Sequence, residues 1–376
     1  MVTNQPACFL GIRTNCSWAN PELVTIDSYG GNPDIVATRE EIQRVANEIK
    51  LAAEELTAFG TLESLLSEPL HQLQYRVSTI GVLAKLEKLY GSCLLASEQY
   101  FSTEAQIHRR FEIHFVPEIA AVGNNIAKTL GWKLDHEVSA SASKKRLVMP
   151  PNSITAMLDR LWEVSSKSEP TVGIDVFETT GPKRTVIVYI PGTQTLGLGD
   201  GVNPLDLQSN TLAMQGGGLA ASERAVLEAM KQAGVQSNDS VIFVGHSQGG
   251  MVAGNLSQNP SGYIAAGLVA VGAPIAQLKI TKIPVMAIEH VNDPVPNAAG
   301  KVNPLAKNWV TVQRKALSSE SAAPVHSHSL KSYRNTTEKV DASKSYGIAN
   351  IRSQLLSQVN GSPVGKALDF VISREF

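Results

Sequence analysis

The chain carries almost no excess charge, because 33 Lys and Arg residues face 34 Asp and Glu residues for a formal net charge of −1. No global field therefore attracts nucleic acid or an anionic membrane surface. Long apolar runs are also missing. The longest, residues 263–276, contains Gly267, Gly272 and Pro274 and is too short to span a bilayer. The sequence predicts neither a nucleic-acid partner nor a transmembrane segment.

Cysteine is scarce as well. The three cysteines, Cys8, Cys16 and Cys93, show no metal-binding spacing, and their odd number argues against a full disulfide framework. A single disulfide between Cys8 and Cys16 is compatible with this number. The first residues lack the basic end and apolar block of a Sec-type signal peptide. We therefore expect no metal and no cofactor, and a protein that is cytoplasmic or exported by a non-Sec route.

What is present is the composition of a globular protein, with 43% hydrophobic and 18% charged residues in a chain of 376. Its first part has helical periodicity. Thr38 and Glu41 form a capping box, and apolar residues then recur at helical spacing up to Gly60. Residues 74–100 and 103–129 repeat such a pattern. The sequence predicts an all-helical N-terminal domain over residues 1–143.

The second part, residues 150–376, has a different pattern. Residues 144–152, with Pro150 and Pro151, are predicted to be a linker, and residues from about 150 onward to fold and act alone. A helix capped by Asn152 or Ser153 is followed by a hairpin, a long glycine-bearing loop, and strands and helices in alternation. The expected elements are strands before and after Gly181-Pro182, a helix ending at Gly234, a strand at 240–245, a helix from Gln248, and strands at 265–273 and 284–291.

Strands with continuous apolar stretches, separated by helices, are typical of a parallel sheet that is covered on both faces. We therefore predict an α/β fold with a mostly parallel sheet and helices on both of its faces, preceded by the helical region.

One junction in this part carries a chemical signal. Residues 241–250 read VIFVGHSQGG, which places a G-x-S-x-G motif between a buried strand and a helix. A tight turn of this kind lifts the side chain of Ser247 above the edge of the sheet. Gly245 and Gly249 leave the room that the turn needs, and the helix N-terminus supplies N–H groups beside the serine. The sequence predicts that Ser247 is a nucleophile.

A serine hydroxyl needs a base that is oriented by an acid, and in this context the acid follows the serine along the chain. Asp293 begins a loop just past the apolar strand 284–291, where Pro294 and Pro296 restrict the backbone. We expect Asp293 to be the acid, with Glu289, inside the strand, as the alternative.

In the order that is typical of this strand-turn-helix motif, the histidine that acts as the base follows the acid along the chain. Four of the eight histidines precede the predicted sheet, His246 lies in the turn itself, and His290 precedes Asp293. His326 and His328 remain, and spacing alone does not separate them. His328 stands at the start of a stretch with helical character, residues 329–341, which could fix its ring.

Acyl-transfer chemistry also requires hydrogen-bond donors for an oxyanion. One expected donor is the backbone N–H of Gln248, directly after the nucleophile. The second is Thr193, in the turn Gly192-Thr193-Gln194 that follows a strongly apolar strand. Thr193 has both an N–H and a hydroxyl to offer.

These residues resemble the α/β-hydrolase superfamily, and in particular the predicted actinobacterial α/β-hydrolases that carry an N-terminal helical region. The similarity covers residues 150–345 and rests on YIPGT (189–193), the block at 203–210, GHSQGG (245–250), NDPVP (292–296) and HSLKSYRNTTEKVD (328–341). Class 3 lipases are more distantly similar. The resemblance implies ester hydrolysis, and its spacing of histidine, tyrosine, threonine and aspartate implies His328 as the base, followed by Tyr333, Thr336 and Asp341.

The N-terminal half resembles the helical hairpins of type VII secretion, because Tyr100 and Glu104 form a Y-x-x-x-E motif. That likeness implies export by this pathway, with its machinery or a helical protein as a partner. The function expected from the sequence is that of a serine esterase or lipase-like hydrolase acting on a small-molecule or lipid ester. The alternatives are a non-catalytic binding module with a hydrolase fold, and an acyltransferase with the same triad.

Overall fold

The computed structural model of the protein describes residues 26–31, 46–58, 82–88, 90, 137–143, 145–179, 183–194, 201–206, 209, 219–320 and 325–375. The chain divides into two compact units, one formed by residues 1–34 and 114–376 and the other by residues 35–113. The first unit contains the sheet.

Helices are found in the described part of the second unit, over residues 46–58 and 82–88. Their less exposed positions repeat at helical spacing and coincide with the apolar stripes predicted from the sequence: Ile49, Ala53, Leu56, Leu83, Leu86 and Tyr90. Several other predictions for the N-terminal half lie outside the described residues: the helix at 103–129, the Tyr100–Glu104 motif and all three cysteines.

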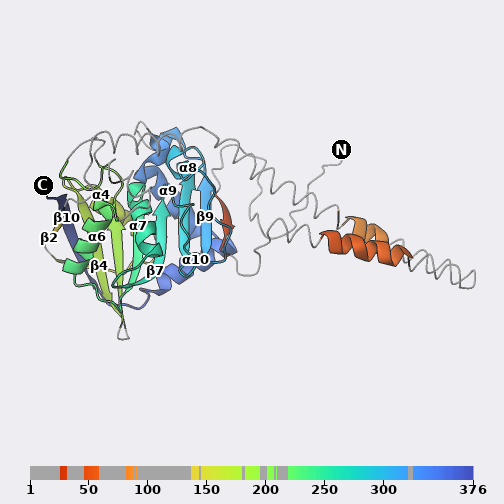
Figure 1. The fold of residues 1–376 in the computed structure, drawn as a ribbon, viewed down its shortest axis with the longest axis horizontal. Helices are drawn as coiled ribbons and strands as arrows, with labels where there is room; N and C mark the ends of the chain where they lie inside the picture. The colour runs from red at the N-terminus through yellow and green to blue at the C-terminus, as the bar shows by residue number, and fades with distance from the viewer. Residues whose placement is uncertain are drawn as a thin grey trace, which may run out of the picture. The chain divides into compact units, whose positions relative to one another are not determined.

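Ten strands of the first unit form one mixed sheet (Figure 1). Their order is β1-β9-β8-β7-β6-β5-β4-β10-β2, and β3 also pairs with β10. The strands are β1 (Asp27–Gly30), β2 (Val138–Ala142), β3 (Arg146–Val148), β4 (Thr171–Glu178), β5 (Arg184–Ile190), β6 (Ser240–His246), β7 (Ile264–Val271), β8 (Val285–His290), β9 (Trp309–Arg314) and β10 (Gly365–Arg374).

Only the central strands, β5 to β9, run parallel to one another. The pairs β4–β5, β4–β10, β2–β10, β3–β10 and β1–β9 are antiparallel. The α/β class agrees with the prediction, but the expectation of a mostly parallel sheet is wrong. β4 pairs with β5 as the predicted hairpin. The other antiparallel strands, β1, β2, β3 and β10, lie in segments that the sequence pattern did not separate from the helical region, the linker and the last residues.

Helices cover both faces of the sheet (Figure 1). In the described part of the first unit the labelled α-helices are α4 (Ile154–Ser165), α6 (Ala221–Gln232), α7 (Gln248–Gln258), α8 (Pro294–Asn297), α9 (Leu330–Ala342) and α10 (Tyr346–Ser357). Two short 3-10 helices, η1 (Ser318–Glu320) and η2 (His326–His328), lie between β9 and α9.

The two faces have separate cores, which explains why the central strands are apolar throughout. Successive side chains of a strand point to opposite faces. In β6, Val241 and Phe243 pack with α6 and α7, whereas Ile242 and Val244 pack with α4, α9 and α10. Both kinds of position are therefore buried.

Residues 1–143 had been expected to be wholly helical, and that expectation is wrong at two places. β1 pairs with β9, and β2 pairs with β10. The predicted linker at 144–152 likewise contains β3, which pairs with β10. These strands are short and rich in serine or basic residues, so they carry no clear apolar alternation, and their partners lie far away in the sequence. No helix in the described ranges is long and apolar enough to cross a membrane.

Candidate active site

Ser247 occupies the sharp turn between β6 and α7. Its backbone has φ 55° and ψ −125°, and it is the one non-glycine residue of the described chain with a positive φ. Such a conformation is costly for a residue with a side chain and persists only when its surroundings impose it. A Cβ on Gly245 would lie 2.2 Å from the carbonyl oxygen of Gly249, and one on Gly249 would lie 2.0 Å from that of Ile190. Both glycines are therefore needed for the turn.

The structure brings together three of the residues predicted to act in catalysis. The Oγ of Ser247 lies 2.9 Å from Nε2 of His328, and Nδ1 of His328 lies 2.7 Å from Oδ2 of Asp293. With Nδ1–H donating to the carboxylate, Nε2 is left to accept the proton of the serine hydroxyl. The three side chains form one hydrogen-bonded chain, in which Asp293 is fully buried and Ser247 is 9% exposed.

Asp293 is held by more than the histidine. It follows β8 and caps the short helix α8, which starts at Pro294, and its Oδ1 accepts the N–H of Val295 at 3.0 Å. The hydroxyl of Tyr333 donates to Oδ2 at 2.7 Å. Tyr333 lies on α9 and is fully buried. Burial raises the pKa of Tyr333 well above its usual value, and the charge of Asp293 raises it further, so the hydroxyl stays a donor.

His328 rather than His326 lies between Ser247 and Asp293. It ends η2, and the next residue, Ser329, caps α9 by accepting the N–H of Ser332 at 3.2 Å. The helix predicted from residue 329 is present as α9. Its start fixes the backbone on the C-terminal side of the histidine.

The ring of His246 binds the backbone carbonyl of His328. Its Nε2 lies 3.0 Å from the carbonyl oxygen of His328, and the centres of the two rings are 4.7 Å apart. Burial, together with the neighbouring His328 ring, lowers the pKa of His246 to about 3. His246 is therefore neutral and donates Nε2–H to the carbonyl. The sequence argument that it does not serve as the base agrees with this position.

His290 forms a second buried support. Its ring stacks on Tyr333 with the centres 3.8 Å apart, its Nδ1 lies 2.6 Å from the Ser327 carbonyl oxygen, and its Nε2 lies 2.7 Å from Oγ1 of Thr336. Burial lowers the pKa of His290 to about 4. The neutral ring thus joins the end of β8 to the residue that precedes His328.

Glu289, the alternative acid, does not join these groups. Its carboxylate accepts hydrogen bonds from Asn303 at 2.6 Å and Gln313 at 3.2 Å. Burial raises the pKa of Glu289 to about 7. Asp341 is also remote from the triad, because its carboxylate accepts the N–H groups of Ile154 and Thr155 at the start of α4, both at 2.9 Å.

The two expected oxyanion donors, Gln248 and Thr193, belong to the turns that follow β6 and β5. Gln248 is the first residue of α7, where backbone N–H groups have no partner within the helix. Thr193 follows Gly192, whose backbone passes so close to Ser247 that an added Cβ would lie 3.0 Å from Cβ of that serine. The strands β5 and β6 that carry these turns are parallel neighbours, so both turns reach the same edge of the sheet.

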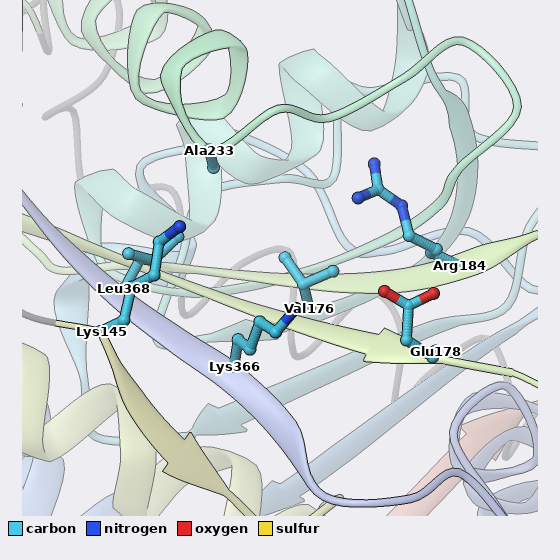
Figure 2. Close-up of a pocket in the computed structure, with 7 residues that line it drawn as sticks. All are labelled: Lys145, Val176, Glu178, Arg184, Ala233, Lys366 and Leu368. Carbon is cyan, nitrogen blue, oxygen red and sulfur yellow. The ribbon is translucent and has the colours of Figure 1, made fainter.

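A pocket of about 130 Å³ lies elsewhere on the sheet (Figure 2). Lys145, Lys366, Arg184 and Glu178 contribute charged side chains to its lining. Arg184 begins β5, at the end opposite to the turn that carries Thr193, and none of the expected catalytic residues lines the pocket. In the described ranges, no group of three or more His, Cys, Asp and Glu side chains is placed to hold a metal ion.

Comparison of the chain with protein-family models, with curated proteins and with solved structures finds no match. Sequence reasoning missed the supporting contacts of His246 and His290, because a histidine that braces a carbonyl has no spacing signature. It named Tyr333 only through a family resemblance.

Proposed function

We propose that the protein is a serine hydrolase that cleaves carboxylic esters through an acyl-enzyme, on the fold of the α/β-hydrolases. The observation that carries this proposal is the unbroken chain from Ser247 through His328 to Asp293, at distances of 2.9 and 2.7 Å, on a strained turn at a helix N-terminus. A base within this reach of a nucleophile, itself oriented by a buried acid, is the arrangement that activates a serine.

The first half of the reaction forms the acyl-enzyme. Oγ of Ser247 bonds to the ester carbonyl carbon while its proton passes to Nε2 of His328, and Asp293 stabilises the resulting imidazolium. The carbonyl oxygen becomes an oxyanion that accepts hydrogen bonds from the N–H groups of Gln248 and Thr193. The carbon–oxygen bond to the alcohol then breaks, and the alcohol leaves with the proton from His328.

The second half releases the acid. A water molecule gives a proton to His328 and adds its oxygen to the acyl carbon, and the bond to Oγ of Ser247 breaks as the serine regains its proton. Uptake of the acyl group by another alcohol follows the same steps, so acyl transfer is a variant of this mechanism. Neither half consumes an oxidant or a reductant.

The loops around the triad favour an ester with an apolar acyl group. Val291, Leu317 and Val325 are 47%, 42% and 52% exposed, and they lie on the loops after β8, after β9 and before η2. Asn292 and Ala316 join the first two of these loops by hydrogen bonds of 3.0 and 2.9 Å. Ligand sites are lined mainly by apolar side chains, and these loops carry the proposed acid and base or are hydrogen-bonded to a loop that does.

A fluorophosphonate probe with mass spectrometry, together with hydrolysis of p-nitrophenyl esters of different chain length, tests the proposal. We expect label on Ser247 alone, and no label and no turnover above the residual rate of a triad-less site in Ser247→Ala. Ser257→Ala is the matched control, because Ser257 is a buried serine of α7, the helix that follows Ser247, and it donates to the Ala253 carbonyl. A folded Ser247→Ala protein with wild-type turnover would refute the proposal, and an unlabelled, inactive wild type would favour the non-catalytic binding module.

A further inference from the structure

An ion pair outside the triad is linked to both turns that carry the expected oxyanion donors. Arg374, at the end of β10, is 4% exposed, and Asp206 is 2% exposed. Nη1 of Arg374 donates to Oδ2 of Asp206 at 2.6 Å, and Nη2 donates to Oδ1 at 2.9 Å. This two-point contact fixes the orientation of the carboxylate as well as its distance.

The arginine binds the backbone around Asp206 as well as its side chain. Nη1 of Arg374 donates to the carbonyl oxygens of Gly201 and Asn203, at 3.0 and 3.2 Å, and the Arg374 N–H donates to that of Val202 at 2.7 Å. Nη2 also donates to Oγ of Ser209 at 2.6 Å. The end of β10 therefore holds residues 201–206, which we call the anchored segment.

Two consecutive carbonyl groups of the anchored segment bind the two sides of the site. The Leu205 carbonyl accepts the N–H of Gln194 at 2.9 Å, and Gln194 is the residue next to Thr193. The Asp206 carbonyl accepts Nε2 of Gln248 at 3.1 Å. Asn203 strengthens the first link, because its amide contacts both Gln194 and the N–H of Leu205.

The side-chain amide of Gln248 has few other hydrogen bonds among the described residues. Gln248 is 2% exposed, and its Oε1 is buried with no hydrogen-bond partner among the described residues. The Asp206 carbonyl is therefore the contact that orients this amide. A shift of the anchored segment would therefore move Gln194, which is next to the expected donor Thr193. It would also move the side chain of Gln248, the second expected donor.

We infer that Arg374 and Asp206 are positioning residues that act through the anchored segment to set the two oxyanion donors, Thr193 and Gln248. The inference rests on the proposed function. Neither side chain touches the reacting atoms. Their loss should therefore weaken binding of the transition state and leave binding of the substrate nearly unchanged.

The test compares two buried arginines in the full chain. In Arg374→Gln we expect kcat for a p-nitrophenyl ester to fall about 10- to 100-fold, with KM within about twofold, because losing one oxyanion donor outright costs roughly 100- to 1000-fold. A trifluoromethyl ketone, which forms a tetrahedral adduct with the serine, should lose affinity by the same factor as kcat/KM. Arg374→Lys should recover part of both losses.

Arg160→Gln is the matched control. Arg160 is 6% exposed and binds the buried Asp175 at 3.1 Å. Its ion-pair partners belong to α4, β4 and β10, and its guanidinium lies 5.7 Å from the centre of the Tyr189 ring on β5, so it does not bind the anchored segment. We expect this variant to melt at a lower temperature than wild type. Its kcat, measured below the melting range, should stay within about threefold of wild type, because the catalytic groups keep their positions.

Amide hydrogen exchange gives a measurement that does not need turnover. Exchange over residues 190–194 and 245–250 should rise in Arg374→Gln and not in Arg160→Gln. Asn203→Ala, which leaves the ion pair intact, should raise exchange over 190–194. If wild type neither turns over esters nor reacts with the probe, the proposed function fails, while the exchange measurement still decides the positioning. The inference would be overturned if folded Arg374→Gln had the amide exchange and the kcat of wild type. Equal losses of kcat in Arg374→Gln and Arg160→Gln would also overturn it.

Discussion

The two histidines of η2 differ in what their rings contact. The ring of His328 lies between Ser247 and Asp293, whereas no such contact involves His326. We therefore expect His328→Ala to lower kcat by roughly 10⁴- to 10⁶-fold, as in other triads that lose their base, and His326→Ala to change it little. Steady-state kinetics with a p-nitrophenyl ester measure both. Comparable losses in the two variants would contradict the assignment of the base.

Tyr333 contributes one hydroxyl to the site, and its removal should be measurable. Tyr333→Phe deletes the hydrogen bond to Asp293, and a buried bond to a charged group contributes about 1.5–3 kcal/mol to stability. Because Asp293 orients His328, we also expect kcat to fall roughly 10- to 100-fold through a misplaced imidazole. Urea denaturation and kinetics report the two effects.

Tyr263→Phe is the control for this experiment. Tyr263 is also a buried tyrosine, but its hydroxyl donates to the neutral Leu256 carbonyl at 2.9 Å, at the opposite end of β7 from the site. It should lose only about 1 kcal/mol of stability and keep its kcat. If Tyr333→Phe behaves like Tyr263→Phe, the hydroxyl has no role in positioning Asp293.

At the scale of residues, the sequence predicted the groups that carry a chemical signature. A serine between glycines after an apolar strand, an acid at a strand end and a histidine before a helix can each be read from one stretch of chain. Arg374, His246 and His290 cannot, because their partners are backbone carbonyls or side chains from distant segments. Such contacts exist only after folding.

At the scale of elements, His290 joins β8 to the segment that carries the base, and this contact should depend on pH. Burial lowers the pKa of His290 to about 4 in the folded protein, against an ordinary value of about 6.5 in the unfolded chain. Between these values the unfolded chain binds a proton that the folded protein does not, so acid favours unfolding at this residue.

The free energy of unfolding of wild type should therefore fall, relative to His290→Gln, by about 1.4 kcal/mol per pH unit as pH decreases from 6.5 to 4. The advantage of wild type over the variant is largest near pH 7 and shrinks toward pH 4. Urea denaturation of both proteins across this range measures the difference, in which the other titrating groups largely cancel. A difference that does not vary with pH would show that His290 is not held neutral.

The elements that the sequence predicted share clear local signals. α4 has Ser153 as its N-cap, α6 is followed by Gly234 at φ +75°, and β5 to β8 are continuous apolar strands. β9 and β10 were not recognised, and β1 to β3 were assigned to other structure. The short flanking strands have no clear apolar alternation in their sequences. They are stabilised by pairing with strands that are distant in the chain, and the preference of a segment for a sheet depends on such neighbours.

At the scale of the whole molecule, the place of β2 and β3 changes where the chain can be shortened. The sequence predicted that residues from about 150 onward fold alone, but both strands precede that point and pair with β10. A chain of residues 150–376 would expose that edge of β10, and an unpaired strand edge invites association with other chains.

We therefore expect residues 137–376 to be more soluble and to melt at a higher temperature than residues 150–376. Both shortened chains lack β1, so the comparison isolates β2 and β3. Size-exclusion chromatography and thermal melting of the two proteins give the answer. Equal solubility and equal melting temperatures would mean that these strands contribute little to the sheet.

The position of β10 also bears on how the protein is made. It is the last of the described strands to leave the ribosome, yet it lies inside the sheet, between β2 and β4. Until it emerges, β4 keeps a free hydrogen-bonding edge, so the nascent sheet is open on one side and exposed to misassembly. Arg374 arrives with the same strand. A newly synthesised chain thus completes its sheet and anchors residues 201–206 in one event, when β10 emerges. On this basis activity should appear only once β10 has been made, rather than grow with chain length.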